Sequence, residues 1–214
     1  TIVDVLAYNT YITSYNANMV ANEVFIDSAT LRENIVALAR NIGYVPKSRT
    51  AASATVSFFV DTTSITPTPS TITLKKGPVA STAGAFSNQS FIFSILEDIT
   101  VPVFDGIASF DNIEIHEGVL LESNFVYSSS NLNQKFILPN AGIDTDLISV
   151  RVKTNQFATA AAKYSLQDSL FEINSDSKVY YLQEVEDERY ELIFGDGVFG
   201  KALEEGNYIT ANYI

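Results

Sequence analysis

After Lys47-Ser48-Arg49 the apolar residues of this sequence recur at every second position, and this spacing restricts the possible folds more than any other feature. A spacing of two predicts a half-buried strand, and the short runs that follow are separated by turn residues. The first run alternates Ala54, Val56, Phe58 and Val60 with Thr55, Ser57, Phe59 and Asp61. The further predicted strands are 71–74, 91–96, 113–115, 119–127, 135–138, 147–152, 179–185, 190–194 and 207–213.

Many short strands with regular turn signals predict an antiparallel sheet, sandwich or barrel. Aromatic residues make up 12% of the chain, which also favours β structure. The stretch 156–170 breaks the pattern and is predicted to be a loop or one helical turn. The predicted class is α+β, mainly β. It has two N-terminal helices (1–48), an antiparallel β domain like a sandwich or barrel (49–155), and a C-terminal β-hairpin region (156–214) expected to pack with the helices and the first strand.

The second helix is predicted to run from about residue 31 to residue 42. Thr30 and Glu33 have the capping-box spacing, in which the two side chains accept hydrogen bonds from exposed backbone N–H groups. Gly43 is suited to the left-handed position that follows a helix, and Pro46 prevents its continuation. The apolar face of this helix consists of Leu31, Ile35, Leu38 and Ile42.

The first helix carries a stripe of apolar residues at alternating spacings of three and four. The stripe covers about two heptads, fewer than a coiled coil needs. Two interpretations are open: the helix packs on its own domain, or it continues an upstream helix and docks on a partner subunit. The candidate subunit-contact residues are Val5, Tyr8, Ile12, Tyr15 and Met19.

Charge and composition exclude several classes of function. The formal net charge of −12 opposes binding to nucleic acid or to an anionic membrane surface, because both require Lys and Arg. The chain has no Cys, which excludes disulfides and thiolate metal sites. No apolar run reaches the 18 residues of a membrane span, and the N-terminus does not resemble a signal peptide. The sequence lacks an initiator Met and ends within a predicted strand, so we expect a fragment of a longer polypeptide.

The segment Gly195-Asp196-Gly197-Val198-Phe199-Gly200 matches the glycine spacing of dinucleotide-binding loops. Phosphate binding also requires a helix that begins at these glycines, and here Gly206 follows within about a turn. We therefore predict a structural hairpin and no cofactor. Asp196-Gly197 would form a tight turn with positive φ at Gly197, and Gly200 would allow a bulge or a close backbone approach.

No catalytic or metal-binding set is evident among the remaining polar residues. The single histidine, His116, is predicted to be a solvated turn residue. Asp144 and Asp146 lack the glycine and distal Glu of a calcium loop. The acidic run Glu184, Glu186, Asp187, Glu188 and Glu191 is predicted to be a solvated connection between two strands. We therefore predict no catalytic, cofactor-binding or metal-binding residue, no small-molecule substrate and no enzymatic activity.

Three stretches of the sequence resemble the baseplate wedge proteins of contractile-tailed phages and the related baseplate J-like proteins. They are the helix and its end at 29–46, the strand at 52–58, and the segment 192–201 with the strand after Gly206-Asn207. The middle, 62–176, is similar mainly in its general β character. The resemblance implies no catalytic residue, and it gives the glycine segment the role of a fold element and possible subunit contact.

The resemblance implies a structural protein of the virion tail baseplate, assembled in the host cytoplasm. Such a subunit would associate with itself and with other wedge proteins, join neighbouring wedges into a ring around the hub, and transmit the change that triggers sheath contraction. The abundance of Tyr and Phe over Lys suits an interaction protein. The alternative is a receptor- or glycan-binding β domain of a tail fiber or surface protein, although the two helices before the β region oppose it.

Overall fold

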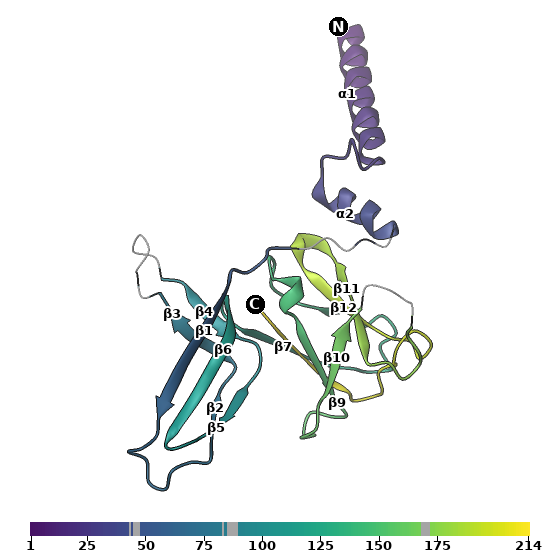
Figure 1. Ribbon diagram of the computed structural model, residues 1–214. Helices are drawn as coiled ribbons and strands as arrows, with labels where there is room; N and C mark the ends of the chain where they lie inside the picture. The colour runs from purple at the N-terminus through teal and green to yellow at the C-terminus, as the bar shows by residue number, and fades with distance from the viewer. Residues whose placement is uncertain (43, 45–47, 83, 85–89, 168–171) are drawn as a thin grey trace.

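The computed structural model describes residues 1–42, 44, 48–82, 84, 90–167 and 172–214 of the chain. Two α-helices, α1 (Ile2–Glu23) and α2 (Arg32–Asn41), precede a body made of β structure. Figure 1 shows α1 projecting away from this body, with α2 between them. The predicted mainly-β class is therefore confirmed.

Helix α1 begins with a capping box at its first turn. The Asp4 N–H donates to Thr1 Oγ1, and the Asp4 carboxylate accepts from the Thr1 N-terminus at 2.7 Å. This arrangement satisfies backbone groups that the first turn of a helix leaves unpaired. Within the described part of the chain, neither helix combines the length and the apolar character that a membrane crossing requires.

Helix α2 ends at Asn41. The Tyr44 N–H donates to the Ala39 carbonyl at 3.0 Å, which is the outer hydrogen bond of a Schellman motif. Gly43, Pro46 and the Glu33 side chain, on which the predicted caps depended, lie outside the described residues.

The first β unit, which we call the β module, covers residues 53–117. Four strands pair antiparallel in the order β1-β6-β4-β3, and β2 and β5 form a separate two-stranded sheet. Five buried residues form the core, with partly buried residues of β2 and β5 packed on them: Ile95, Ala108, Phe110, Ile113 and Ile115. The strands are β1 (Ser53–Asp61), β2 (Thr71–Leu74), β3 (Gly77–Ser81), β4 (Ile92–Ile95), β5 (Ile99–Pro102) and β6 (Ile107–Glu117).

The second β unit, which we call the C-terminal sheet, has the strand order β7-β13-β9-β10-β11-β12-β8. Its pairs are antiparallel except for β10 with β11. Phe125 of one end strand contacts Phe136 of the other, so the sheet curls into a barrel-like shape. Its strands are β7 (Leu121–Val126), β8 (Phe136–Ile137), β9 (Ser149–Lys153), β10 (Ala162–Leu166), β11 (Val179–Glu184), β12 (Tyr190–Phe194) and β13 (Tyr208–Tyr213), with short 3-10 helices at Thr145–Leu147 and Glu186–Glu188.

The sheets group the strands differently from the predicted ranges. Strands β7, β8 and β9 precede residue 155 yet belong to the C-terminal sheet, because β7 and β9 both pair with β13. Strand β1 pairs with β6, and its expected packing with the C-terminal region remains a prediction. Strands β3, β5 and β10 were not predicted. Proline interrupts the alternation in β3 (Pro78) and in β5 (Pro102). In β10 polar residues obscure the alternation.

Candidate subunit interface

The predicted contact stripe lies on a helix that the other described residues leave uncovered. No residue of α1 is buried. Tyr8 is 68% exposed and Tyr15 is 54% exposed, while Ile12 is half-buried by its own helix neighbours. Of the two interpretations left open by the sequence, packing of α1 on its own domain is therefore wrong. Docking on a partner remains a prediction.

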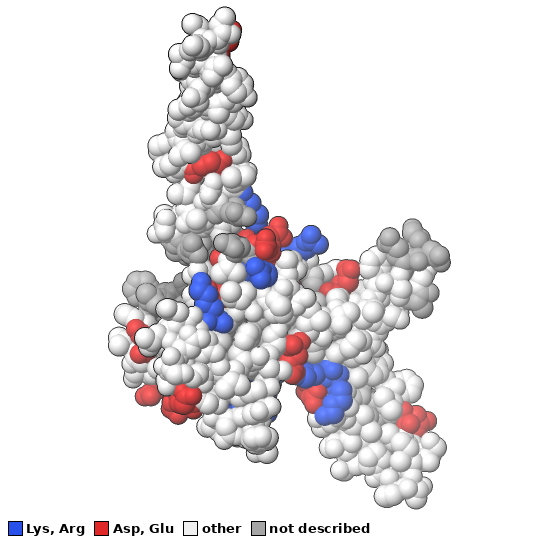
Figure 2. Space-filling view, turned by 180° about the vertical axis from the view of Figure 1, so that it is seen from behind, with Lys and Arg blue, Asp and Glu red and all other residues white. Residues whose placement is uncertain are grey.

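The surface of α1 is uncharged over most of its length. Asp4 and Glu23 are its only charged residues, and the 18 residues between them include none. Figure 2 shows the helix as an almost white rod, with acidic side chains only near its ends. Ile2, Leu6 and Val20 are also exposed, and helical geometry places them roughly 110° around the axis from the stripe. Apolar residues thus cover more than one side of the helix.

Glu23, the last residue of α1, fixes the start of α2. Its carboxylate accepts hydrogen bonds from Thr30 Oγ1 at 2.6 Å, from the Thr30 N–H at 3.0 Å and from Asn34 Nδ2 at 2.7 Å. The hydrogen bonds from Asn34 and then Thr30 lower the pKa of Glu23 to about 2. Thr30 was predicted to form a capping box with Glu33, whereas its hydroxyl donates to Glu23. We call this junction the elbow.

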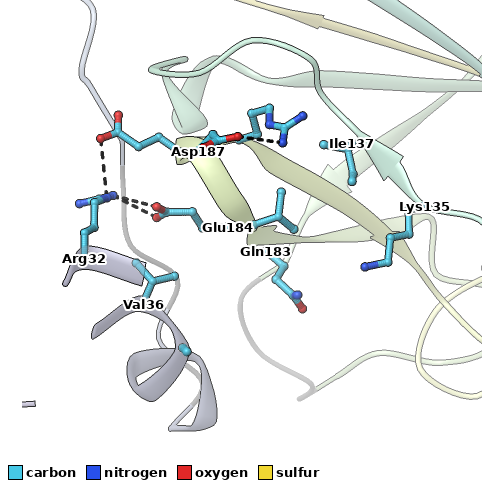
Figure 3. Close-up of a pocket in the computed structure, with 11 residues that line it drawn as sticks. Arg32, Val36, Lys135, Ile137, Gln183, Glu184 and Asp187 are labelled. Carbon is cyan, nitrogen blue, oxygen red and sulfur yellow. Dashed lines mark hydrogen bonds and ion pairs between the residues drawn. The ribbon is translucent and has the colours of Figure 1, made fainter. Parts of the chain in front are cut away.

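Helix α2 contacts the C-terminal sheet through an ion pair. The Arg32 guanidinium lies 3.0 and 3.1 Å from the two carboxylate oxygens of Glu184 and 3.8 Å from Glu188 (Figure 3). The Glu184 side chain is only 3% exposed, so it needs this cation. Glu184 and Glu191 are both buried, and the prediction that the acidic run is solvated is wrong for them. They lie in paired strands rather than in the turn between the strands.

A cavity of about 610 Å³ separates α2 from the strands below it. Val36 and Ile137 lie on opposite sides of it, and Lys135 and Gln183 border it (Figure 3). Val36 is buried, but Leu31 and Ile42 of the predicted apolar face are 54% and 75% exposed. Ile35 and Leu38 of the same face are half-buried, so the predicted apolar face is covered only in part.

The glycine segment forms a compact loop rather than a hairpin between paired strands. Strand β12 before it pairs with β11 and β8, and β13 after it pairs with β7 and β9. The Asp196 carboxylate accepts from the N–H groups of Val198 and Phe199, both at 2.9 Å. These two bonds hold the pKa of Asp196 below its usual value.

The backbone geometry explains why glycine occupies positions 195, 197 and 200 of this loop. Gly197 has a φ of +89°, as an Asp-Gly turn requires, and Gly200 has a φ of +97°. A Cβ on Gly195 would lie 2.2 Å from the Gly200 carbonyl carbon, so two backbone segments cross here at contact distance. Val198 and Phe199 at the tip are 64% and 47% exposed. The loop is therefore a fold element with an apolar tip.

The β module is attached to the C-terminal sheet by a charged clasp, formed by two residues from neighbouring turns. Lys76 donates to Glu122 at 2.8 Å and to Asn212 at 2.9 Å. Glu97 accepts from Lys163 at 2.8 Å and lies 3.3 Å from Arg151. Mixed charges gather where the two β units meet (Figure 2). This clasp was not predicted from the sequence, although Lys75-Lys76 in a turn of an acidic chain was an available signal.

His116 and Asp144, the remaining candidate residues from the sequence, are held within the fold. His116 lies within β6 with 15% of its side chain exposed, so the prediction of a solvated turn is wrong. Asp144 is buried and accepts from the N–H groups of Ala51 and Asp146. In the described ranges, no three His, Asp or Glu side chains come together as metal ligands would.

Comparison with known proteins agrees with a structural class. A family described as bacteriophage baseplate wedge protein gp6, third domain, matches residues 119–214, the part that folds as the C-terminal sheet. Over 212 residues the chain is 26% identical to the baseplate wedge protein gp6 of Enterobacteria phage T4. The resemblance to phage baseplate wedge proteins is confirmed. The aligned region covers 99% of this chain and 30% of the T4 protein.

Proposed function

We propose that this chain is a non-enzymatic part of a wedge subunit that joins neighbouring wedges into a ring around the hub and transmits the change that triggers sheath contraction. The observation that carries the proposal is the exposed, uncharged helix α1. A lone helix in water is marginally stable, and most helices gain their stability from packing an apolar face. This one is 22 residues, or roughly 33 Å, long and packs on nothing in the described chain.

The partner of α1 should itself present an apolar helical surface, from a second copy or from another wedge protein. Its contact would use the stripe of Val5, Tyr8, Ile12, Tyr15 and Met19. Exposed apolar residues continue this surface past the elbow, because Phe25 and Leu31, which lie between the two helices, are 66% and 54% exposed. Glu23 keeps the two helices in a fixed relation, so a partner could bind both helices at once.

The test is a pair of charged substitutions in the stripe. Tyr8→Asp with Ile12→Asp should abolish association through α1, since two carboxylates would have to be desolvated. Sedimentation velocity measures the loss. Thr10→Asp with Ser14→Asp has the same spacing on the opposite side of the helix and serves as the control. Unchanged sedimentation of the stripe variant, with or without other wedge proteins, would contradict the proposal.

To transmit a rearrangement, a protein needs parts that each move as one body. The β module and the C-terminal sheet are two such parts. Their core clusters share no residue. Contacts between them include the clasp, whose Lys76 and Glu97 side chains are 39% and 41% exposed. Exposed ion pairs contribute little to stability, and polar contacts between domains permit relative motion. We infer that the clasp holds one of two orientations of the β module.

Removing one ion of the clasp tests this inference. The chain has no Cys, so Ser109→Cys in the β module and Leu132→Cys in the C-terminal sheet provide two unique labelling sites. Lys76→Met should broaden the distance distribution between the labels, as should salt of about 1 M, which screens exposed charges. Lys75→Met is the matched control, because Lys75 pairs with Asp98 inside the β module. Identical distributions for both variants would contradict a movable clasp.

A further inference from the structure

We propose that the outer edge of β1 is a pairing surface for β1 of a second copy of this chain, joining two β modules into one continuous sheet. This inference rests on the self-association in the proposed function but uses a surface other than α1. In the described chain β1 pairs with β6 on one side, and no described strand pairs with its other side. An unpaired edge offers a row of N–H and C=O groups to another strand.

The direction of the free backbone groups follows from the two ends of β1. The Ala52 carbonyl accepts from the Glu117 N–H, and the Thr62 N–H donates to the Gly106 carbonyl, both at 2.7 Å. In an antiparallel pair the residues bonded to the neighbour alternate with residues whose groups point away. The even-numbered residues of β1 therefore bond to β6, and Thr55, Ser57 and Phe59 point their N–H and C=O groups outward.

The irregularity in this ladder leaves β1 itself regular. Val56 pairs with Ile113 and Phe58 with Phe110, so the extra residue of the bulge lies on β6. Asn112, at the bulge, has a φ of +54°. Strand β1 therefore remains extended over its nine residues.

The two edge strands of the four-stranded sheet differ in how well they are protected against pairing with another strand. Strand β3, at the opposite edge, contains Pro78 and a bulge between Pro78 and Ala80. Proline and bulges are devices by which proteins prevent edge-to-edge pairing. Strand β1 has no proline, no bulge of its own and no charged residue before Asp61. One edge of the sheet is blocked and the other is open.

The sequence of β1 fits an antiparallel copy of itself. Ser57 is the midpoint of the strand, and pairing centred on it uses all nine residues and joins the outward-pointing groups of both copies. Val56 would lie opposite Phe58 of the second copy, and Thr55 opposite its Phe59. Aromatic and β-branched residues are favourable cross-strand neighbours. Phe59, which is 69% exposed in the single chain, would gain a neighbour.

Charge also favours a second copy over a charged partner. The chain carries a net charge of −12, so two copies repel one another except where the contact surface is uncharged. In the centred register Asp61 lies opposite Ser53, and no acidic residue of one β1 faces an acidic residue of the other. Strand β1 contains no cationic residue, and its one carboxylate, that of Asp61, lies at the end of the strand.

Proline substitution separates the outer edge from the inner ladder. The experiment uses the chain carrying Tyr8→Asp and Ile12→Asp, so that association through α1 is absent. In this background the chain should still dimerise in sedimentation equilibrium. Thr55→Pro removes an outward N–H and should weaken dimerisation at least tenfold, whereas Thr55→Val should not. A monomeric parent chain, or equal association of the two variants, overturns the proposal and leaves the role of α1 intact.

A cross-link tests the register without relying on stability. In a hydrogen-bonded antiparallel pair the Cα atoms are about 5.5 Å apart, within the range of a disulfide. Ser57→Cys in the same background should form an intermolecular disulfide on mild oxidation, because Ser57 would face itself across the two-fold axis. Thr55→Cys should not, because it would face Phe59. Equal cross-linking of both variants, or none in either, overturns the proposal.

Discussion

The β module contains the two longest strands of the molecule, β1 and β6, yet it buries a much smaller core than the C-terminal sheet. Among the described residues, thirteen buried ones form the core of the C-terminal sheet, including Tyr180, Tyr190 and Tyr213, whereas five form that of the β module. Large aromatic side chains contribute most of the apolar area in such a core. The C-terminal sheet therefore supplies most of the stability, and the β module, with its small core, is the attached part.

Removing a central side chain from each core sharpens this contrast most strongly. Ile209→Ala in β13 should lower the free energy of unfolding by about 4 kcal/mol, because Ile209 is fully buried. Ile115→Ala in β6 should instead speed hydrogen exchange in β6 and leave β9 protected. Hydrogen exchange measured by mass spectrometry distinguishes the two. Equal loss of protection in β6 and β9 for Ile115→Ala would show a single cooperative unit and break the comparison.

The glycine loop should be the most sensitive surface element of the C-terminal sheet. Gly195→Ala places a Cβ against the Gly200 backbone and should cost about 3 kcal/mol in urea unfolding. Gly197→Val should cost about 1 kcal/mol or more, since its φ is positive but its Cβ would meet only Ala202 at 3.8 Å. If Gly197→Val is the more harmful change, the crossing of the two backbone segments is not the main constraint.

The attachment of α2 to the C-terminal sheet rests on a buried carboxylate. Arg32→Met leaves Glu184 without its bidentate partner and should destabilise the fold by about 2 kcal/mol, because Arg32 is half-exposed and water replaces part of the lost interaction. Adding Glu184→Gln should recover part of this loss, which thermal unfolding can measure. A melting temperature unaffected by Arg32→Met would mean that α2 is held elsewhere.

The elbow gives the smallest effect and a clear dependence on pH. The pKa of Glu23 in the folded chain lies below its usual value, so the stability that its ionised carboxylate contributes is fully present above about pH 4.5. This stability is lost as the pH falls through about 2. Asn34→Ala should raise the pKa of Glu23 toward its ordinary value, because the Asn34 amide is the largest cause of the shift. An NMR titration of the Glu23 carboxyl group measures it. An unchanged pKa would show that the Asn34 amide does not control the ionisation of Glu23 in the elbow.

The sequence was sufficient where a local pattern determines the structure. Alternation predicted β2 and β12 with their observed ends, and the Asp196-Gly197 pair predicted the positive φ of Gly197. The apolar stripe on α1 could be predicted as a pattern, but its partner could not. A spacing of three and four describes which side of a helix is apolar without saying what covers that side.

Local patterns failed where distant segments decide the outcome. Glu184 lies in an acidic run that is typical of solvent, yet Arg32, 152 residues away, allows it to be buried. Asp196-Gly197 is typical of a hairpin, but the order of strands in the sheet separates β12 from β13. Pairing between strands depends on the whole topology, which residue spacing does not contain.

The position of β13 has a consequence for how the chain folds. It lies between β7 and β9, and it pairs Tyr213 with Leu121 across more than ninety residues of sequence. Contacts between such distant residues require closure of a long loop before any stabilising interaction forms, and they slow folding to milliseconds or seconds. Strand β7 therefore stays unpaired until β13 has been made, and β13 completes the sheet by pairing with both β7 and β9.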